Sequence, residues 1–141
     1  MKKIPSPIAR QVSREMLHWM QTTANVSITD YSAQSTITGW ASFTTKRLDY
    51  KVDQDNTLTT YFEINGESNA ATISFVLPYA AAFNTYAVLW SKDANQWPQW
   101  AWAEIAAGSH TVNIYKNTVN GAWDTSGTKW IKGQLSYEII A

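Results

Sequence analysis

The sequence predicts an all-β fold, an antiparallel β-sandwich or jelly-roll-like domain preceded by one short N-terminal amphipathic helix, and three observations support this. After Asn25 the spacing of apolar residues changes from about 3.6 positions to about 2, the period of a strand. From there onward Thr, Ser, Val, Ile and aromatic residues dominate, in short runs divided by turn sequences such as VDQDN and AAGSH. No helical pattern separates these runs, whereas a parallel sheet would need crossover helices. The strands are therefore expected to pair antiparallel.

Residues 1–25 are predicted to form an N-terminal arm and helix. Ser6 and Pro7 are residue types preferred at a helix N-cap and at the first helical position. An isolated helix of about four turns is marginal in water, so its apolar stripe is expected to pack on the domain or on copies of itself in an oligomer. We therefore predict an anchor or an oligomer contact. The stripe consists of Ile8, Val12, Met16, Trp19 and Met20.

Residues 26–141 are predicted to form one β domain. A chain of 141 residues can bury a core without disulfide or metal staples, and short strands at this spacing are typical of sandwiches and jelly rolls. The predicted strands cover residues 27–31, 40–44, 48–52, 57–64, 71–77, 87–91, 99–104, 111–116 and 132–140.

The stretch YFEINGESNAATISFVLP, residues 61–78, joins two of these strands around an Asn-Gly pair. Leu58, Phe62 and Ile64 share one face of the first strand. In a hairpin with an even-numbered connection they stand opposite the apolar residues of the second strand. The two strands could alternatively arch between two sheets, and the pattern permits both arrangements. In either, these side chains belong to the core and NGESN is a bend. The apolar residues of the second strand are Ile73, Phe75 and Leu77.

Composition and charge exclude several classes of function. The chain has 11 Lys and Arg against 11 Asp and Glu, so it lacks the basic footprint of a nucleic-acid-binding protein. It contains no cysteine, and hence no disulfide, thiolate nucleophile or Cys-ligated zinc. The N-terminal MKKIPSPIAR lacks the apolar core of a signal peptide, and no later run has the length of a membrane span. We expect a soluble, unprocessed chain without nucleic-acid or membrane partners.

The sequence is rich in aromatic residues, with 8 Trp and 7 Tyr, and three of the tryptophans cluster in WPQWAW. In an extended strand Trp100 and Trp102 face the same way, and with Trp97 in the preceding turn they could form a stacking platform for sugar rings. Alternatively, individual indoles belong to the core or to a subunit contact. The polar residues expected to assist glycan binding are Asp93, Asn95, Gln96 and Gln99.

No metal site and no cofactor are predicted. Asp53, Asp55 and Asn56 could chelate calcium if a further carboxylate converged on them, but the glycine and distal Glu of an EF-hand are missing. Asp and Asn also favour β-turns through their own hydrogen bonds, so a hairpin turn is the preferred interpretation. His18 and His110 are the two histidines, and they have no paired-ligand spacing.

Enzymatic activity is not predicted either. Ser68 and Ser126 lack a nucleophile elbow and the acid–histidine order of a catalytic triad. Two distant carboxylates could still meet in space to hydrolyse a glycosidic bond, but the sequence singles out no such pair.

Residues 39–78 and 110–139 resemble the small β-sandwich domains of tailed-phage virion proteins, which occur in tail-fibre and receptor-binding tips, head fibres and related surface proteins. The shared features are a strand of the form aromatic-x-I-x-G, a GxSN bend, a strand ending in LP, and a C-terminal W-x-x-S-G-x-K-x-I-x-G-Q-x-x-Y. In this chain they are Phe62, Ile64, Gly66, Ser68, Asn69, Leu77, Pro78, Trp123, Ser126, Gly127, Lys129, Ile131, Gly133, Gln134 and Tyr137.

The resemblance implies a non-enzymatic structural protein displayed on the virion, which is assembled in the host cytoplasm. Receptor-binding domains usually end long fibrous chains, whereas here only a short helix precedes the β domain. A homotrimeric capsid-decoration or head-fibre-type accessory subunit, bound to other virion proteins, is therefore expected. The alternative is a tail-fibre, receptor-binding or carbohydrate-binding module that recognises host glycans through exposed tryptophans.

Overall fold

The computed structural model describes residues 27–94, 96, 98–116 and 122–140. The predicted helix, with the stripe from Ile8 to Met20, lies outside these residues. The described chain is built of strands and the turns between them. The strands are β1 (Thr29–Asp30), β2 (Ile37–Thr38), β3 (Trp40–Val52), β4 (Thr57–Ser68), β5 (Ile73–Val76), β6 (Thr85–Asp93), β7 (Gln99–Ile105), β8 (Thr111–Lys116) and β9 (Thr128–Glu138).

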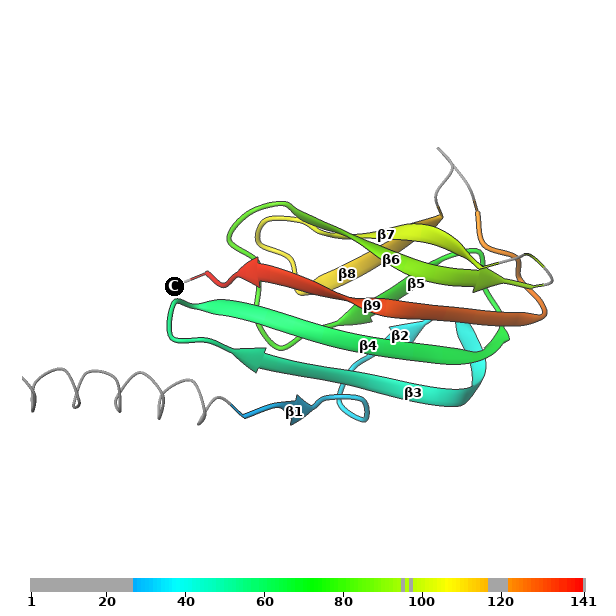
Figure 1. Cartoon of the computed structure of the whole chain (residues 1–141), viewed down its shortest axis with the longest axis horizontal. Coiled ribbons are helices and arrows are strands. Elements are labelled where there is room, and N and C mark those ends of the chain that lie inside the picture. Colours follow the sequence, from blue (N-terminus) through cyan, green and yellow to red (C-terminus); the bar gives the residue numbers. More distant parts are fainter. Residues whose placement is uncertain (1–26, 95, 97, 117–121, 141) are drawn as a thin grey trace, which may run out of the picture.

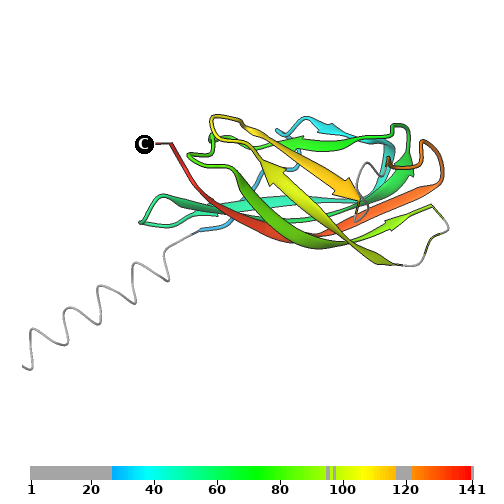
Figure 2. The same cartoon turned by 90° about the horizontal axis from the view of Figure 1, so that it is seen from above.

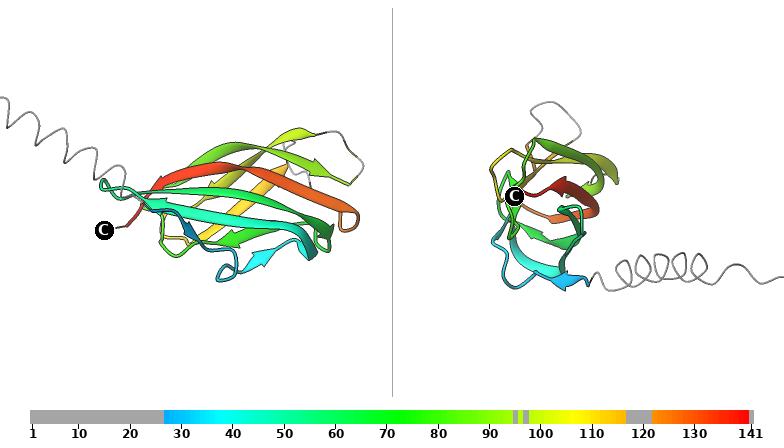
Figure 3. Two further views of the ribbon diagram at one scale, coloured as in Figure 1. Left: turned by 60° about the horizontal axis from the view of Figure 1, so that its bottom comes forward. Right: turned by 90° about the vertical axis from the view of Figure 1, so that its left-hand side faces the viewer.

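The nine strands of the described residues form one continuous sheet in the order β1-β3-β4-β9-β6-β7-β8-β5-β2 (Figure 1). Every pairing between these strands is antiparallel, which confirms the predicted all-β antiparallel class. The sheet curls round its core, as the right-hand panel of Figure 3 shows in a view along the strands. In Figure 2, β7 and β8 cross the direction of β3 and β4 at an angle, as the twist of strands requires. The architecture is thus a single curled sheet.

The predicted strands overlap the observed ones, but β4 continues to Ser68, β9 begins at Thr128, and two further differences concern β3 and β2. Residues 40–44 and 48–52 belong to one strand, β3, which pairs with β4 along its whole length. Its register against β4 shifts twice, between Trp40 and Ser42 and between Phe43 and Thr45. These bulges bend the strand without ending it. Its polar middle resembled a break in the sequence because both faces of the strand are largely exposed over residues 41–47. Strand β2 was not predicted, since two residues are too few for a periodic pattern.

The stretch of residues 61–78 forms an arch, and the hairpin alternative is wrong. β4 pairs with β3 and β9, whereas β5 pairs with β8 and β2. Asn65 and Gly66 lie inside β4, opposite the bulged part of β3, and not in a turn. Glycine is required there because a Cβ at position 66 would overlap the carbonyl oxygen of Ser42. Ser68 is buried, and its Oγ donates a hydrogen bond to the Asp124 carbonyl oxygen, so Ser68 has a structural role.

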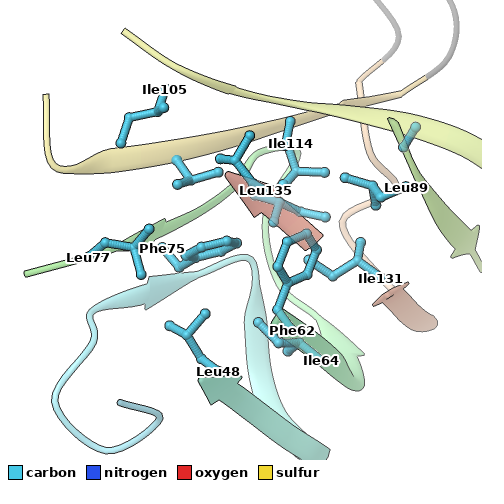
Figure 4. Packing of buried hydrophobic residues seen from close by; sticks show 14 of the residues in the cluster. Leu48, Phe62, Ile64, Phe75, Leu77, Leu89, Ile105, Ile114, Ile131 and Leu135 are labelled. Carbon is cyan, nitrogen blue, oxygen red and sulfur yellow. The ribbon is translucent and has the colours of Figure 1, made fainter. Parts of the chain in front are cut away.

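The apolar sets of β4 and β5 meet across the core, as their alternation predicted. The ring centroids of Phe62 and Phe75 lie 5.1 Å apart, and both rings point into the same core as Leu48 and Leu135 (Figure 4). All four side chains are at most 2% exposed. Each buried side chain of this size stabilises the fold by roughly 1.5–3 kcal/mol, so the arch brings together a large part of the hydrophobic stabilisation.

One end of the core contains a buried lysine. The Lys129 Nζ donates hydrogen bonds to the carbonyl oxygens of Gly39 at 3.0 Å and Ala70 at 2.7 Å. It also lies 5.7 Å and 5.9 Å from the ring centroids of Trp40 and Trp123. Burial lowers the pKa of Lys129 to about 8. The ammonium group therefore ties β9 to the start of β3 and to the turn after β4.

Candidate binding surface

Strands β6 and β7 place large side chains on the surface and small ones in the core. In β7, Ala101 and Ala103 are fully buried, while Trp100 is 48% exposed. In β6, Val88 is 71% exposed and Trp90 is 59% exposed. Burying an aromatic side chain stabilises a fold far more than burying alanine, so this arrangement gives up hydrophobic stabilisation. Folding alone does not account for it, and a contiguous exposed apolar surface of this kind marks an interaction site.

These residues form one continuous surface on the outside of β6, β7 and β8, which we call the aromatic face. The strand register sets Trp90 opposite Trp100 and Val88 opposite Trp102. The next strand sets Tyr115 opposite Trp102, and their rings stack with centroids 4.4 Å apart. The aromatic face consists of Tyr86, Val88, Trp90, Trp100, Trp102 and Tyr115.

The sheet holds the aromatic face in a fixed shape. β7 is hydrogen-bonded to β6 on one side and to β8 on the other. The Trp102 ring is in contact with two others, since the Tyr86 centroid lies 6.0 Å away on the side opposite to that of Tyr115. Partial burial and the nearby Glu104 carboxylate raise the pKa of Tyr115 above its ordinary value. A surface fixed in this way loses little conformational entropy when it binds.

A groove of about 420 Å³ adjoins the aromatic face where β6 and β9 separate. β6 pairs with β9 only along Trp90 to Asp93, so the two strands part beyond Trp90. Next to the last pair, before the strands diverge, Gly133 lets Leu89 pack directly against β9, because a Cβ at position 133 would lie 2.6 Å from the Leu89 Cβ. Phe62, Leu89 and Gly133 line the groove from the core side of the sheet. Its outward side chains are Arg47, Tyr61, Glu63, Val88, Trp90, Lys132 and Gln134.

The structure places some residues of the predicted glycan platform. Trp100 and Trp102 lie on the same face of β7, as predicted. Gln99 begins that strand, and its Nε2 donates a hydrogen bond to the Gln96 Oε1 at 2.7 Å. Trp97 and Asn95 lie outside the described residues. Of the three predicted tryptophans, Trp100 is therefore exposed and Trp102 is half-buried between its neighbours.

Asp93 is not a ligand-facing residue, and this corrects the prediction. Its side chain is fully buried, because it points inward from β6 in the same direction as Ser91 and Leu89. The Lys116 Nζ lies 2.8 Å from Asp93 Oδ2, and the Asp124 backbone N–H donates to the same carboxylate at 3.1 Å. A buried carboxylate requires such partners. Asp93 therefore stabilises the fold.

Four members of the aromatic face were not predicted as site residues. The sequence YAVLW at residues 86–90 alternates large and small side chains, but apolar residues occupy both faces of the strand. Periodicity identifies a strand without showing which apolar face is buried. The outward set is the one opposite to Leu89, which is buried. These four residues are Tyr86, Val88, Trp90 and Tyr115.

The VDQDN sequence forms the turn between β3 and β4. The Asn56 N–H donates to the Asp53 carbonyl oxygen at 3.1 Å, and the Thr57 N–H donates to Asp55 Oδ1 at 3.3 Å. Asn56 has a φ of 62°, a left-handed conformation that Asn tolerates. Among the described residues, no three or more His, Cys, Asp or Glu side chains gather so that they could hold a metal ion. In the same part of the chain, no helix has the length and hydrophobicity needed to cross a membrane.

In comparisons with known proteins, no family model, no curated protein and no solved structure matches this chain. Its function is therefore inferred from its own residues and their geometry.

Proposed function

We propose that the protein is a non-enzymatic structural protein of the phage virion surface, which docks on another virion protein through the aromatic face. The resemblance of residues 39–140 to virion β-sandwich domains and the all-β antiparallel scaffold support this proposal. Under this proposal, the single curled sheet of this chain would be the counterpart of the sandwich in those domains. The observation that carries the proposal is the exposure of Tyr86, Val88, Trp90 and Trp100 on one fixed face.

Docking would be driven by the burial of this exposed apolar area. Trp and Tyr are enriched at protein interfaces and supply much of their binding energy, chiefly at the centre of the contact. Stable interfaces usually bury more than about 1,000 Å² in total, so the polar rim around the aromatic face would also take part. On a particle, many copies bind side by side, and modest contacts then add through multivalency.

The N-terminal segment, residues 1–20, provides the second contact in this proposal. Its apolar stripe would hold the homotrimer together or anchor it to the particle. Light scattering on the full chain and on residues 27–141 tests this: the full chain is expected to have three times the monomer mass and the truncated chain a single monomer mass. The stripe residues are Ile8, Val12, Met16, Trp19 and Met20.

The number of copies per particle tests the docking proposal. Particles of the phage that encodes the chain are prepared with the wild type or with Trp100→Ala, and the copies are counted by quantitative mass spectrometry. Loss of a central interface tryptophan typically costs at least about 2 kcal/mol, so the variant is expected to be largely absent from purified particles. Trp100 is exposed, so the variant should remain folded.

Phe83→Ala is the matched control for this experiment. Phe83 is 63% exposed, more than Trp100, but lies in the loop before β6 and outside the aromatic face. It is expected to leave the copy number unchanged. The docking proposal would be abandoned if wild-type particles lacked the chain, or if Trp100→Ala and Phe83→Ala were incorporated equally.

A further inference from the structure

We propose that the groove beside the aromatic face is a second binding site, which takes a neutral carbohydrate. It lies across β3, β4, β9 and β6, whereas the proposed docking surface lies on β6, β7 and β8. The inference goes beyond the docking proposal, because it adds a small-molecule ligand and residues of β3, β4 and β9, while Val88 and Trp90 belong to both surfaces. It also places the saccharide elsewhere than the WPQWAW segment.

The strand register arranges the groove residues in two rows. In the first row Arg47 lies opposite Glu63, Glu63 opposite Lys132, and Lys132 opposite Trp90. Because neighbouring strands lie about 4.8 Å apart, this row spans roughly 14 Å, which exceeds the width of one sugar ring. In the second row Tyr61 stands opposite Gln134. Polar side chains thus extend from one aromatic side chain across four strands.

The charges in the groove compensate one another. The Arg47 Nε donates to Asp49 Oδ2 at 2.7 Å, and the Lys132 Nζ lies 3.5 Å from Glu63 Oε2. The lining itself carries Arg47, Lys132 and Glu63. Asp49 lies outside the lining and pairs with Arg47, so the four charges together sum to zero and a polyanion or a cationic ligand finds little electrostatic attraction. The Lys132–Glu63 pair is exposed and therefore weak, so ligand hydroxyls can insert between its members at little cost.

The side-chain chemistry of the groove fits a sugar. Trp90 presents an indole that is 59% exposed, and the C–H face of a pyranose ring stacks on such a surface. Arg47, Glu63 and Gln134 are planar groups that offer pairs of donors or acceptors, which match adjacent hydroxyls. An apolar peptide would instead desolvate these groups without satisfying them. A neutral ligand with many hydroxyl groups, a hexose oligomer, satisfies both the apolar and the polar sides.

The test is glycan binding by the full chain on an array that holds neutral, sialylated and sulfated oligosaccharides. At least one neutral oligosaccharide is expected to be retained, and its affinity is then measured by calorimetry. Trp90→Ala and Gln134→Ala are each expected to weaken binding about tenfold, which corresponds to 1.4 kcal/mol. Tyr86→Ala is the matched control: Tyr86 is also 59% exposed on the same face of β6 but does not line the groove, so its affinity should be unchanged.

Three results would overturn the inference. The first is that the array retains no neutral oligosaccharide, and the second is that it retains only sialylated or sulfated ones. The third is that folded Trp90→Ala and Gln134→Ala, checked by circular dichroism, bind the retained sugar as the wild type does.

Copy number on particles separates this inference from the docking proposal. Gln134→Ala is expected to lower sugar affinity while the copies per particle stay unchanged, and Trp100→Ala is expected to do the reverse. A loss of copies in Gln134→Ala would show that the virion partner occupies the groove, which contradicts the saccharide assignment.

Discussion

The same substitution is expected to lower stability far more at Trp123 than at Trp100. Trp123 is 3% exposed, and its Nε1 donates to the Ile114 carbonyl oxygen at 3.0 Å. Trp123→Ala would leave a cavity and remove this hydrogen bond, so the free energy of unfolding is expected to fall by roughly 3–5 kcal/mol. Trp100 is 48% exposed, and Trp100→Ala is expected to change the free energy of unfolding by less than about 1 kcal/mol.

Urea unfolding of the full chain, followed by far-ultraviolet circular dichroism, measures both values. Trp40→Ala serves as a second buried case, because Trp40 is 5% exposed and its Nε1 donates to the Lys129 carbonyl oxygen at 2.9 Å. It is expected to be destabilised to a similar degree as Trp123→Ala. If Trp100→Ala cost as much as the two buried variants, Trp100 would be a core residue and the aromatic face would not be available for docking.

Two further predictions concern the backbone and the buried lysine. Gly66→Ala is expected to lower the free energy of unfolding by roughly 2–4 kcal/mol, because the new Cβ would displace the β3 backbone at Ser42. The control Gly108→Ala meets no neighbour within 4 Å. It should lower the free energy of unfolding by only about 1 kcal/mol, because of its φ of +80°. Equal costs in thermal unfolding would contradict the close approach. Lys129 has a pKa of about 8 when folded against 10.5 ordinarily, so between these values the unfolded chain binds more protons and the free energy of unfolding should rise with pH. Burial raises the pKa of Tyr137 above its ordinary value of 10.0, which opposes this trend above about pH 10, so urea unfolding is compared at pH 7.5 and pH 9.5. No rise in the wild type, or the same rise in Lys129→Met, would refute the assignment.

Much of the fold could be predicted from local patterns. The alternation of apolar and polar residues and the turn sequences located almost every strand. The same alternation placed the rings of Phe62 and Phe75 in the core. The alternation could not distinguish an arch from a hairpin, because both arrangements bury the same side chains. That choice depends on which strands β4 and β5 pair with, and their partners lie far away in the sequence.

The candidate site was less predictable, because it depends on contacts between distant strands. Asp93 is of a residue type that binds sugars and lies near WPQWAW in the sequence, so it was predicted as a ligand residue. The sequence did not indicate its burial, because its partner Lys116 lies on another strand. Trp90 lies on a strand with apolar residues on both faces, so the sequence did not indicate that it points outward. The groove combines side chains from four strands, and nothing in the spacing of Arg47 and Lys132 brings them together.

Oxidative footprinting of the aromatic face is the most direct test of the docking proposal. The chain is exposed to hydroxyl radicals once free in solution and once bound to purified particles, and the oxidation of each residue is measured by mass spectrometry. Tyr86, Trp90 and Trp100 are expected to react in the free protein and to be protected on the particle, while exposed Phe83 reacts in both. Equal oxidation of the three aromatic residues in the free and bound protein would contradict docking through the aromatic face.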